Sequence, residues 1–482
     1  MSAIYIPRRG RSARSPRWLL AAGLLIVSAA GVRAQPDERS PLDDRPPQSA
    51  VVEPDSDTGK PPSIQSSLGP LGDPGGFRTR LEKSGITYRM IYTNEVLGNI
   101  SGGFRTGAIY AGKLESLLAV DFEKLAGLSG LSLFANSFQI HDTGGLRDRS
   151  FGRLITVSNI EAYPTTRLSE LWLEQKWDGD RFGLRIGQIT ADGEFFAADY
   201  GKIFLSNDWP TITGANLPSG GPAYPLATPG LRLRFDPDAS TSALVAVFNG
   251  NPGDQRFVNR NGTNFRLNDS PLVMAELQYR FNQQKDAPGP AGSVKLGGYH
   301  HAGRFEDLRY DTAGLPLADP FGTGIGRRLS GTGGLYGVAE FQLYRPPGGG
   351  PEDGITAYTR ISASPSDRSL IDRWADGGIV VSGLVPGRPD DKFGISVIYA
   401  RIGAGARGFD RDLRRLTGTV QPIRSFEASL EVTYQAQVAP GWLVQPDFQY
   451  VFKPAGGSVS PLDPAARVKG GALFGLRSTL VY

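Results

Sequence analysis

The sequence predicts an all-β fold: a closed, 16-stranded antiparallel β-barrel of the outer-membrane kind, with short periplasmic turns and long extracellular loops. Three observations support this fold: the composition, a recurring alternation of apolar and polar residues, and the spacing of the alternating runs. The 482 residues include 63 Gly, 24 Phe, 17 Tyr and only 3 Met, a balance typical of strands. The mean hydropathy of −0.24 excludes a polytopic helical membrane protein. It does not exclude a barrel, whose strands are apolar on one face.

The amino terminus has the pattern of a secretory signal peptide. Five arginines between positions 8 and 17 precede an apolar run over 18–32, and small residues follow at the usual cleavage position. We assign residues 1–34 to this leader. They hold six arginines and no acid, so their removal changes the formal net charge from +4 to −2. The basic character therefore belongs to the leader, and we expect no nucleic-acid partner.

Residues 35–76 form a second compositional segment. They contain nine prolines and eight acidic residues against three basic ones, with no hydrophobic periodicity. Such a segment favours an extended or disordered periplasmic spacer, although docking on a partner is an alternative. The barrel is then assigned to residues 77–482.

Runs of alternating polarity divide the remaining chain. In the clearest run, 425–436, apolar residues from Phe426 to Ala436 alternate with polar ones, which gives a strand with one oily and one wet face. Its length is sufficient to cross a bilayer as a tilted strand. Sixteen runs are predicted as strands: 86–96, 108–121, 131–141, 168–177, 182–190, 229–235, 242–249, 271–281, 292–301, 332–344, 354–364, 375–383, 392–402, 425–436, 441–452 and 471–482.

The gaps between these runs alternate in length. Each odd-numbered gap is longer than the even-numbered gap after it, as expected when long loops are extracellular and short turns periplasmic. The last run ends in Tyr482, on the same face as Phe474, Leu476 and Leu480. A terminal aromatic residue on the lipid-facing row is typical of the strand that the barrel-assembly machinery binds. That machinery and the outer-membrane lipids are therefore expected partners.

Energetics decide which face of each strand points inward. An arginine or lysine on the lipid face costs about 2–4 kcal/mol at mid-membrane, so the charged rows must line the lumen. The predicted pore-lining residues are Arg89, Glu95, Lys113, Glu115, Glu170, Trp172, Glu174, Arg185, Arg232, Arg234, Glu276 and Arg280, with Arg360, Glu427 and Glu431 by the same parity. Both signs are present, which favours a neutral polar solute, because selection for ions needs a ring of one sign.

Several segments resemble the OprB-type carbohydrate-selective porins. They include SLFANSFQIH at 132–141, TVSNIEA at 156–162, LWLEQ at 171–175, LRIGQ at 184–188 and NLPSGGPAYPLATPGLR at 216–232. The resemblance covers residues 70–482 and is densest before residue 280. It implies a 16-stranded outer-membrane barrel through which mono- and small oligosaccharides diffuse passively. The chain departs from the family at Pro74, where Trp is commoner, and at Tyr482, where Phe is commoner.

A sugar site is predicted around Trp172, because an aromatic ring can contact the C–H face of a sugar. Glu170 and Glu174 share its row, and Arg185, Arg232 and Arg234 come from nearby strands. Packing of Trp172 against an infolded loop is the alternative. The gap 191–228 is the predicted constriction loop, because it is the longest gap and is rich in aromatic residues and proline. Its candidate residues are Phe195, Phe196, Tyr200, Trp209 and Tyr224.

Other functions receive less support from the sequence. The absence of cysteine excludes thiol chemistry and Cys-ligated metals, and no nucleophile elbow or phosphate loop occurs. Glu170 and Glu174 lie about 13 Å apart on one strand, too far for a glycosidase pair. We expect no enzymatic activity, no cofactor and no metal. A carbohydrate-active enzyme and an adhesive or scaffolding barrel are the alternatives, and the sequence leaves the choice between monomer and trimer open.

Overall fold

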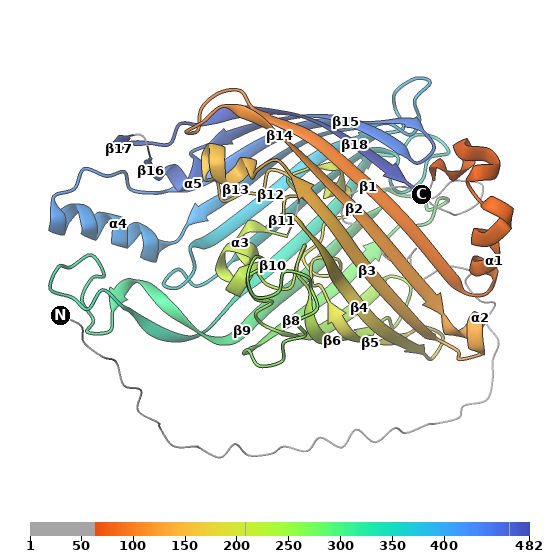
Figure 1. The fold of residues 1–482 in the computed structure, drawn as a ribbon, viewed down its shortest axis with the longest axis horizontal. Helices are drawn as coiled ribbons and strands as arrows, with labels where there is room; N and C mark the ends of the chain where they lie inside the picture. Colours follow the sequence, from red (N-terminus) through yellow and green to blue (C-terminus); the bar gives the residue numbers. More distant parts are fainter. Residues whose placement is uncertain (1–62, 208, 462) are drawn as a thin grey trace, which may run out of the picture. The chain divides into compact units, whose positions relative to one another are not determined.

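The computed structural model describes residues 63–482, except Asp208 and Leu462. The predicted leader and residues 35–62 of the predicted extension lie outside these residues. Sixteen strands form one closed antiparallel barrel in which each strand pairs with the next, and the first pairs with the last (Figure 1). These are β1 (Ile86–Asn99), β2 (Gly107–Asp121), β3 (Leu131–Asp142), β4 (Thr165–Trp177), β5 (Phe182–Ile189), β6 (Thr228–Phe235), β7 (Thr241–Asn249), β8 (Pro271–Phe281), β9 (Gly292–Asp311), β10 (Gly326–Tyr344), β11 (Gly354–Ala363), β12 (Ile371–Ser382), β13 (Lys392–Ile402), β14 (Phe426–Ala439), β15 (Trp442–Phe452) and β18 (Gly471–Val481).

The predicted fold is confirmed, and each predicted run overlaps one barrel strand. The largest differences are at extracellular ends. β9 continues to Asp311 and β10 begins at Gly326, because the two strands pair as a hairpin beyond the lipid belt. A strand outside the membrane needs no apolar row, so the alternation that marks the other strands is lost there. A small separate hairpin, β16 (Val459–Ser460) and β17 (Asp463–Arg467), was not predicted.

The predicted alternation of loop lengths holds for most of the barrel and fails at two places. Residues 100–106 connect β1 to β2 in fewer residues than the periplasmic segment 122–130 uses. Residues 364–370 are likewise fewer than the turn 383–391. At the first place both strands are longer than the sequence pattern indicated, and at the second β12 begins four residues earlier, so the added strand residues shorten the external loop.

The outer face of the barrel is apolar and has an aromatic edge. Exposed side chains on outward positions include Leu173, Ile186, Leu231, Leu233, Val245, Val247, Leu277, Ile379, Ile395 and Val397. At the periplasmic ends of β4 to β6, Phe182 stacks on Trp177 and Phe235, with ring centroids 5.9 and 4.7 Å away. An apolar band with aromatic girdles is the surface that a bilayer requires.

Helices occupy only the connections and the amino-terminal segment. They are η1 (Ile64–Leu71), η2 (Pro74–Gly76), α1 (Phe77–Lys83), α2 (Phe122–Ala126), η3 (Arg147–Phe151), η4 (Tyr200–Ile203), α3 (Thr211–Asn216), η5 (Pro218–Gly220), α4 (Ala404–Thr417) and α5 (Pro454–Gly457). Among the described residues, no helix has the length and apolar composition needed to cross a membrane.

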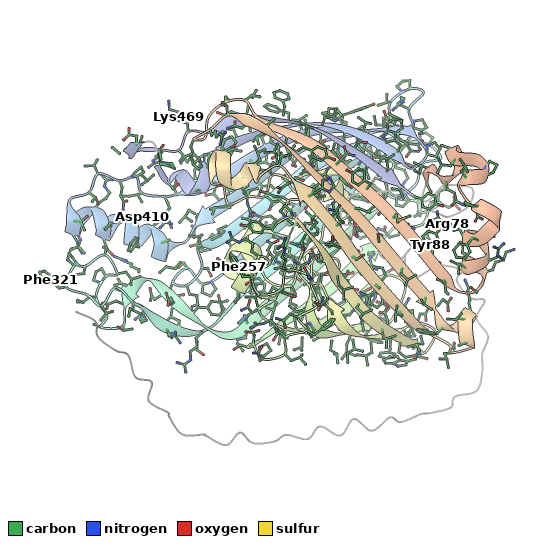
Figure 2. All side chains as sticks on the ribbon, in the orientation of Figure 1. Arg78, Tyr88, Phe257, Phe321, Asp410 and Lys469 are labelled. Carbon is green, nitrogen blue, oxygen red and sulfur yellow. The ribbon has the colours of Figure 1, made fainter. Side chains whose placement is uncertain are left out.

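The amino-terminal helices contact the strand that closes the barrel. The Tyr482 hydroxyl donates a hydrogen bond to the carbonyl of Gly72 (2.9 Å). The Arg78 guanidinium carbon lies 5.0 Å from the ring centre of Tyr482 and 5.3 Å from that of Tyr88 on β1 (Figure 2). Asp73 caps α1 by accepting from the backbone N–H of Arg78 (2.8 Å). Residues 63–83 therefore fasten to both strands of the β1–β18 seam.

Candidate functional site

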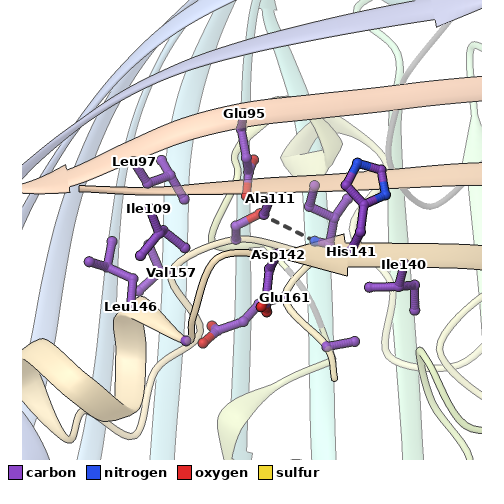
Figure 3. Close-up of a pocket in the computed structure, with 14 residues that line it drawn as sticks. Glu95, Leu97, Ile109, Ala111, Ile140, His141, Asp142, Leu146, Val157 and Glu161 are labelled. Carbon is purple, nitrogen blue, oxygen red and sulfur yellow. Dashed lines mark hydrogen bonds between the residues drawn. The ribbon is translucent and has the colours of Figure 1, made fainter. Parts of the chain in front are cut away.

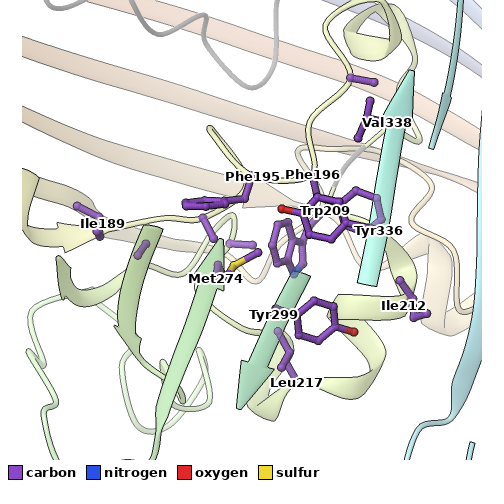
Figure 4. Packing of buried hydrophobic residues seen from close by; sticks show 14 of the residues in the cluster. Ile189, Phe195, Phe196, Trp209, Ile212, Leu217, Met274, Tyr299, Tyr336 and Val338 are labelled. Carbon is purple, nitrogen blue, oxygen red and sulfur yellow. The ribbon is translucent and has the colours of Figure 1, made fainter. Parts of the chain in front are cut away.

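The long connection between β5 and β6, residues 190–227, folds into the barrel. Its predicted residues Phe195, Phe196, Trp209 and Tyr224 are buried, and Tyr200 is partly buried. The ring of Phe196 stacks on Tyr336 of β10 with centroids 4.1 Å apart (Figure 4). The segment thus packs its aromatic side chains against the inner wall of several strands, from Phe138 of β3 to Trp374 of β12.

Inward carboxylates hold this loop through its backbone. The N–H of Phe196 donates to Glu276 (2.8 Å), and the N–H of Tyr200 donates to Glu340 (2.8 Å). Glu431 accepts from the N–H of Leu205 (2.6 Å). Irregular backbone needs partners for its N–H groups wherever water is excluded. Glu276 and Glu431 were predicted as pore-lining residues, and in the structure they serve as anchors of the loop.

A second loop, residues 143–164, also folds inward and was not predicted to do so. Glu427 accepts from the N–H groups of Leu154 and Ile155, both at 2.8 Å. Arg477 of β18 pairs with Glu95 (2.9 Å) and donates to Ser158 and Asn159 of this loop. Glu95 is therefore inward, as predicted, and indirectly secures the loop.

Four charged side chains meet where the infolded loop of residues 190–227 leaves β5. Arg185 donates to Glu194 (2.7 Å) and to Glu174 (3.1 Å). Arg232 donates to both carboxylate oxygens of Glu194, each at 2.7 Å, and contacts Glu174 at 2.9 Å. We call Arg185, Arg232, Glu174 and Glu194 the charge cluster. Its formal charges cancel, and Glu194 is its most accessible member, with 16% of its side chain exposed.

Glu194 is the member that the sequence analysis missed. It lies in the infolded loop, where no strand parity could mark it. The available signal was indirect: Arg185 and Arg232 are directly opposite in the β5–β6 register and face the same way. Like charges in such a pair destabilise a sheet, so a carboxylate between them could have been expected.

Trp172 faces inward, as predicted, but its ring is already covered. The Arg185 guanidinium carbon lies 3.7 Å from its ring centre, and Phe134 of β3 stacks on it at 4.9 Å. Only 2% of the residue is exposed. The predicted open platform for a sugar is therefore absent in this structure. These two covering groups come from neighbouring strands, and the buried cluster that holds Trp172 also includes Ala191 and Phe195 of the infolded loop.

The other predicted pore-lining residues occupy three places. Lys113 and Glu115 are buried and paired at 3.0 Å, and Asn136 donates to Glu115 (2.9 Å). Arg234 pairs with Asp236 (2.7 Å), and Arg280 donates to Gln278, both at the periplasmic mouth. The remaining predicted residues are buried on inward positions: Arg89 on β1, Glu170 on β4 and Arg360 on β11. Glu170 accepts a hydrogen bond from the N–H of Thr190, and Arg360 pairs with Asp376.

A pocket remains between the inner face of β1 to β3 and the second loop (Figure 3). Its polar lining comprises the acidic Glu95, Asp142 and Glu161 with His141 and Ser158, and the rest of its lining is mostly apolar. The Glu95 carboxylate is neutralised by Arg477 (2.9 Å). The second loop therefore leaves part of the inner wall uncovered.

Tyr200 of the infolded loop donates a hydrogen bond from a partly buried position. Burial raises the pKa of this phenol, and the nearby Glu340 carboxylate raises it further. The hydroxyl, which is neutral at physiological pH, donates to the carbonyl of Pro351 (3.0 Å). This contact ties the loop to the β10–β11 turn.

Comparison with known proteins accounts for this architecture. The family model described as carbohydrate-selective porin, OprB family, matches residues 105–482. Porin B of Pseudomonas aeruginosa is 21% identical over 412 residues, covering 80% of this chain and 87% of that protein. The putative porin QuiX of Acinetobacter baylyi is 20% identical over 416 residues, covering 80% and 88%. The high-pH structure of Pseudomonas putida OprB has a TM-score of 0.75 at 20% identity, covering 85% of this chain and 97% of that one. The chain therefore belongs to the OprB family of carbohydrate-selective porins and is a sugar porin of the Gram-negative outer membrane.

Proposed function

We propose that sugars diffuse passively through the lumen, past the charge cluster at the infolded loop of residues 190–227. The observation that carries this proposal is the balance of Arg185 and Arg232 by Glu174 and Glu194. Sugar hydroxyls both donate and accept hydrogen bonds, so a neutral site with two guanidinium groups and two carboxylates can replace their water. Binding must stay weak, because a channel has to release what it admits.

Trp172 has a positioning role in this proposal. Its ring lies 3.7 Å from the Arg185 guanidinium carbon, a cation–π contact that fixes the direction of the donor. Replacing Trp172 with Ala should therefore weaken block of the current by sugar while the barrel still folds. An unchanged block constant would remove Trp172 from the site.

We infer that the channel catalyses no sugar cleavage. Glu174 already accepts from Arg185 (3.1 Å) and contacts Arg232 (2.9 Å), so it is held as an anion. A glycosidase needs one carboxylic acid that keeps its proton, and Glu174 cannot supply that acid. Turnover of a disaccharide that is lost in Glu174→Gln would contradict this inference.

The remaining partners follow from the surface of the barrel. Lipids are expected to contact the apolar band, and the assembly machinery is expected to bind the strand that ends in Tyr482 before the barrel closes. The choice between monomer and trimer stays open.

The deciding experiment is swelling of liposomes that contain the purified protein. Glucose and a disaccharide should enter, and liposomes that stay osmotically tight would end the proposal. In planar bilayers, Arg232→Gln should weaken block of the current by glucose. Arg181→Gln is the matched control, because Arg181 is an exposed arginine in the periplasmic β4–β5 turn, paired with Asp178 (3.3 Å).

A further inference from the structure

Two arginines on the outer face of the barrel lie directly opposite each other. Arg373 of β12 and Arg401 of β13 are cross-strand neighbours, and both occupy outward positions. Arg401 donates to both carboxylate oxygens of Asp372, at 2.8 and 2.9 Å. Arg373 is exposed and forms no ion pair with any residue that the structure describes. Asp372 already neutralises Arg401, so Arg373 is the member of the pair without a counter-charge among the described residues, and an anion beside it would stabilise the pair.

The height of this pair matches the lipid headgroups. Arg373 is nine residues from Ser382, where β12 ends at its periplasmic turn. At ~3.3 Å per residue and a tilt of ~40°, nine residues rise about 23 Å, close to the ~25 Å apolar band of an outer-membrane barrel. The outward residues below Arg401 are Tyr399, Val397, Ile395 and Phe393. The arginines therefore lie where the oily belt ends on the extracellular side.

Helix α4 follows β13 on the extracellular side and is rich in arginine. Residues 401–424 hold six arginines and two aspartates. Both aspartates are buried and paired: Asp410 pairs with Arg424 and Asp412 with Arg309, each at 2.8 Å. Asp412 also contacts the exposed Arg415 at 3.7 Å. Asp410 is labelled on α4 in Figure 2. Of the other helix arginines, Arg411, Arg414 and Arg415 are exposed, and Arg407 is partly buried.

We propose that Arg373, Arg401, Arg411, Arg414 and Arg415, here called the extracellular arginine surface, bind phosphate groups of the outer-leaflet glycolipid. Arginine matches phosphate because its planar fork can donate two parallel hydrogen bonds. The surface begins at headgroup height and extends into the saccharide layer, where phosphorylated glycolipid is the abundant anion. Charge complementarity and position together favour a lipid over a soluble protein, which would need an apolar centre in its contact surface.

The test is native mass spectrometry of the purified full-length porin in detergent. The protein is incubated with bisphosphorylated lipid A or with the same lipid after enzymatic removal of its phosphates. Wild type should retain the phosphorylated lipid and release the other. Arg373→Gln should lower the affinity about fivefold, and Arg373→Gln combined with Arg411→Gln about 25-fold, since each arginine near an anionic lipid surface contributes about 1 kcal/mol.

Arg181→Gln in the exposed periplasmic turn is the matched control and should bind like wild type. Heat-modifiable migration on gels checks that each barrel has folded, and Arg414→Gln replaces Arg373→Gln if that variant does not fold. Equal retention of the two lipids, or an equal loss in Arg181→Gln, would overturn the proposal. The proposal would also be overturned if the arginine variants retained the phosphorylated lipid like wild type but bound a soluble acidic polysaccharide more weakly. Sugar-driven liposome swelling should be normal in every variant, which separates this proposal from the sugar pathway.

Discussion

Glu194 should set the ion preference of the pore. The charge cluster is neutral because two carboxylates balance Arg185 and Arg232. Glu194→Gln leaves one positive charge uncompensated. Through water, a unit charge acts on an ion about 7 Å away with about 0.6 kcal/mol, a factor of about 2.7 in ion occupancy. The occupancy of anions rises by this factor and that of cations falls by it, so the anion-to-cation permeability ratio should rise about sevenfold.

The assay is the reversal potential across a planar bilayer under a KCl gradient. Salt near 0.01 M is needed, because the screening length at 0.1 M is only about 10 Å. Glu194→Asp keeps the charge and is the matched control, with an expected change below about twofold. The glutamine variant should fold, because Glu174 still pairs with both arginines. A correctly folded Glu194→Gln barrel with an unchanged ratio would place the ion path away from the cluster and refute the reasoning.

Three further perturbations test how the barrel holds its inserted and docked segments. Gly394→Val should displace the infolded loop and raise single-channel conductance, because an added Cβ would lie 2.7 Å from the Phe204 ring; unchanged conductance would contradict this packing. Arg78→Ala should lower the melting temperature by a few degrees through loss of two cation–π contacts of about 0.5–1 kcal/mol each, measured by circular dichroism. Burial alone would raise the pKa of Asp391 in the β12–β13 turn, but hydrogen bonds from Arg388, Tyr434 and the N–H of Gln437 hold it below its usual range. The ionised Asp391 therefore stabilises the folded barrel fully above about pH 4, and this stabilisation is lost as pH falls through the lowered pKa. Asp391→Asn should reduce the melting temperature at pH 7 and differ less from wild type near pH 2.

The strands were predictable because the membrane imposes a strict rule on each residue. A charged side chain that faces lipid costs several kcal/mol, so Arg232, Glu427 and Glu431 could be assigned to the inner face from parity alone. The structure places all three on buried, inward positions. The same rule does not reach beyond the membrane, which is why the β9–β10 hairpin and α4 had no signal that the sequence analysis could use.

The contacts of the inward residues were not predictable, because they depend on segments distant in the chain. Glu427 binds the backbone of Leu154 and Ile155, which lie more than 270 positions earlier. The alternation of side chains along β4 predicts that Trp172 points inward, but it does not predict that Arg185 and Phe134 cover its ring. The family resemblance identified the loop segments without indicating which wall groups hold them.

Some inward carboxylates hold the infolded loops through backbone N–H groups, and others pair with basic side chains. Glu276, Glu340, Glu427 and Glu431 accept hydrogen bonds from loop N–H groups. Their oxygens are already occupied by hydrogen bonds from the loops, because an irregular backbone inside a barrel must find acceptors. Glu174 and Glu194 instead bind the side chains of Arg185 and Arg232, whose guanidinium groups keep further donors. In the proposed pathway, a sugar competes for these donors. Sugar selectivity should therefore respond to changes in the charge cluster, whereas changes in the anchoring carboxylates should alter the shape of the pore.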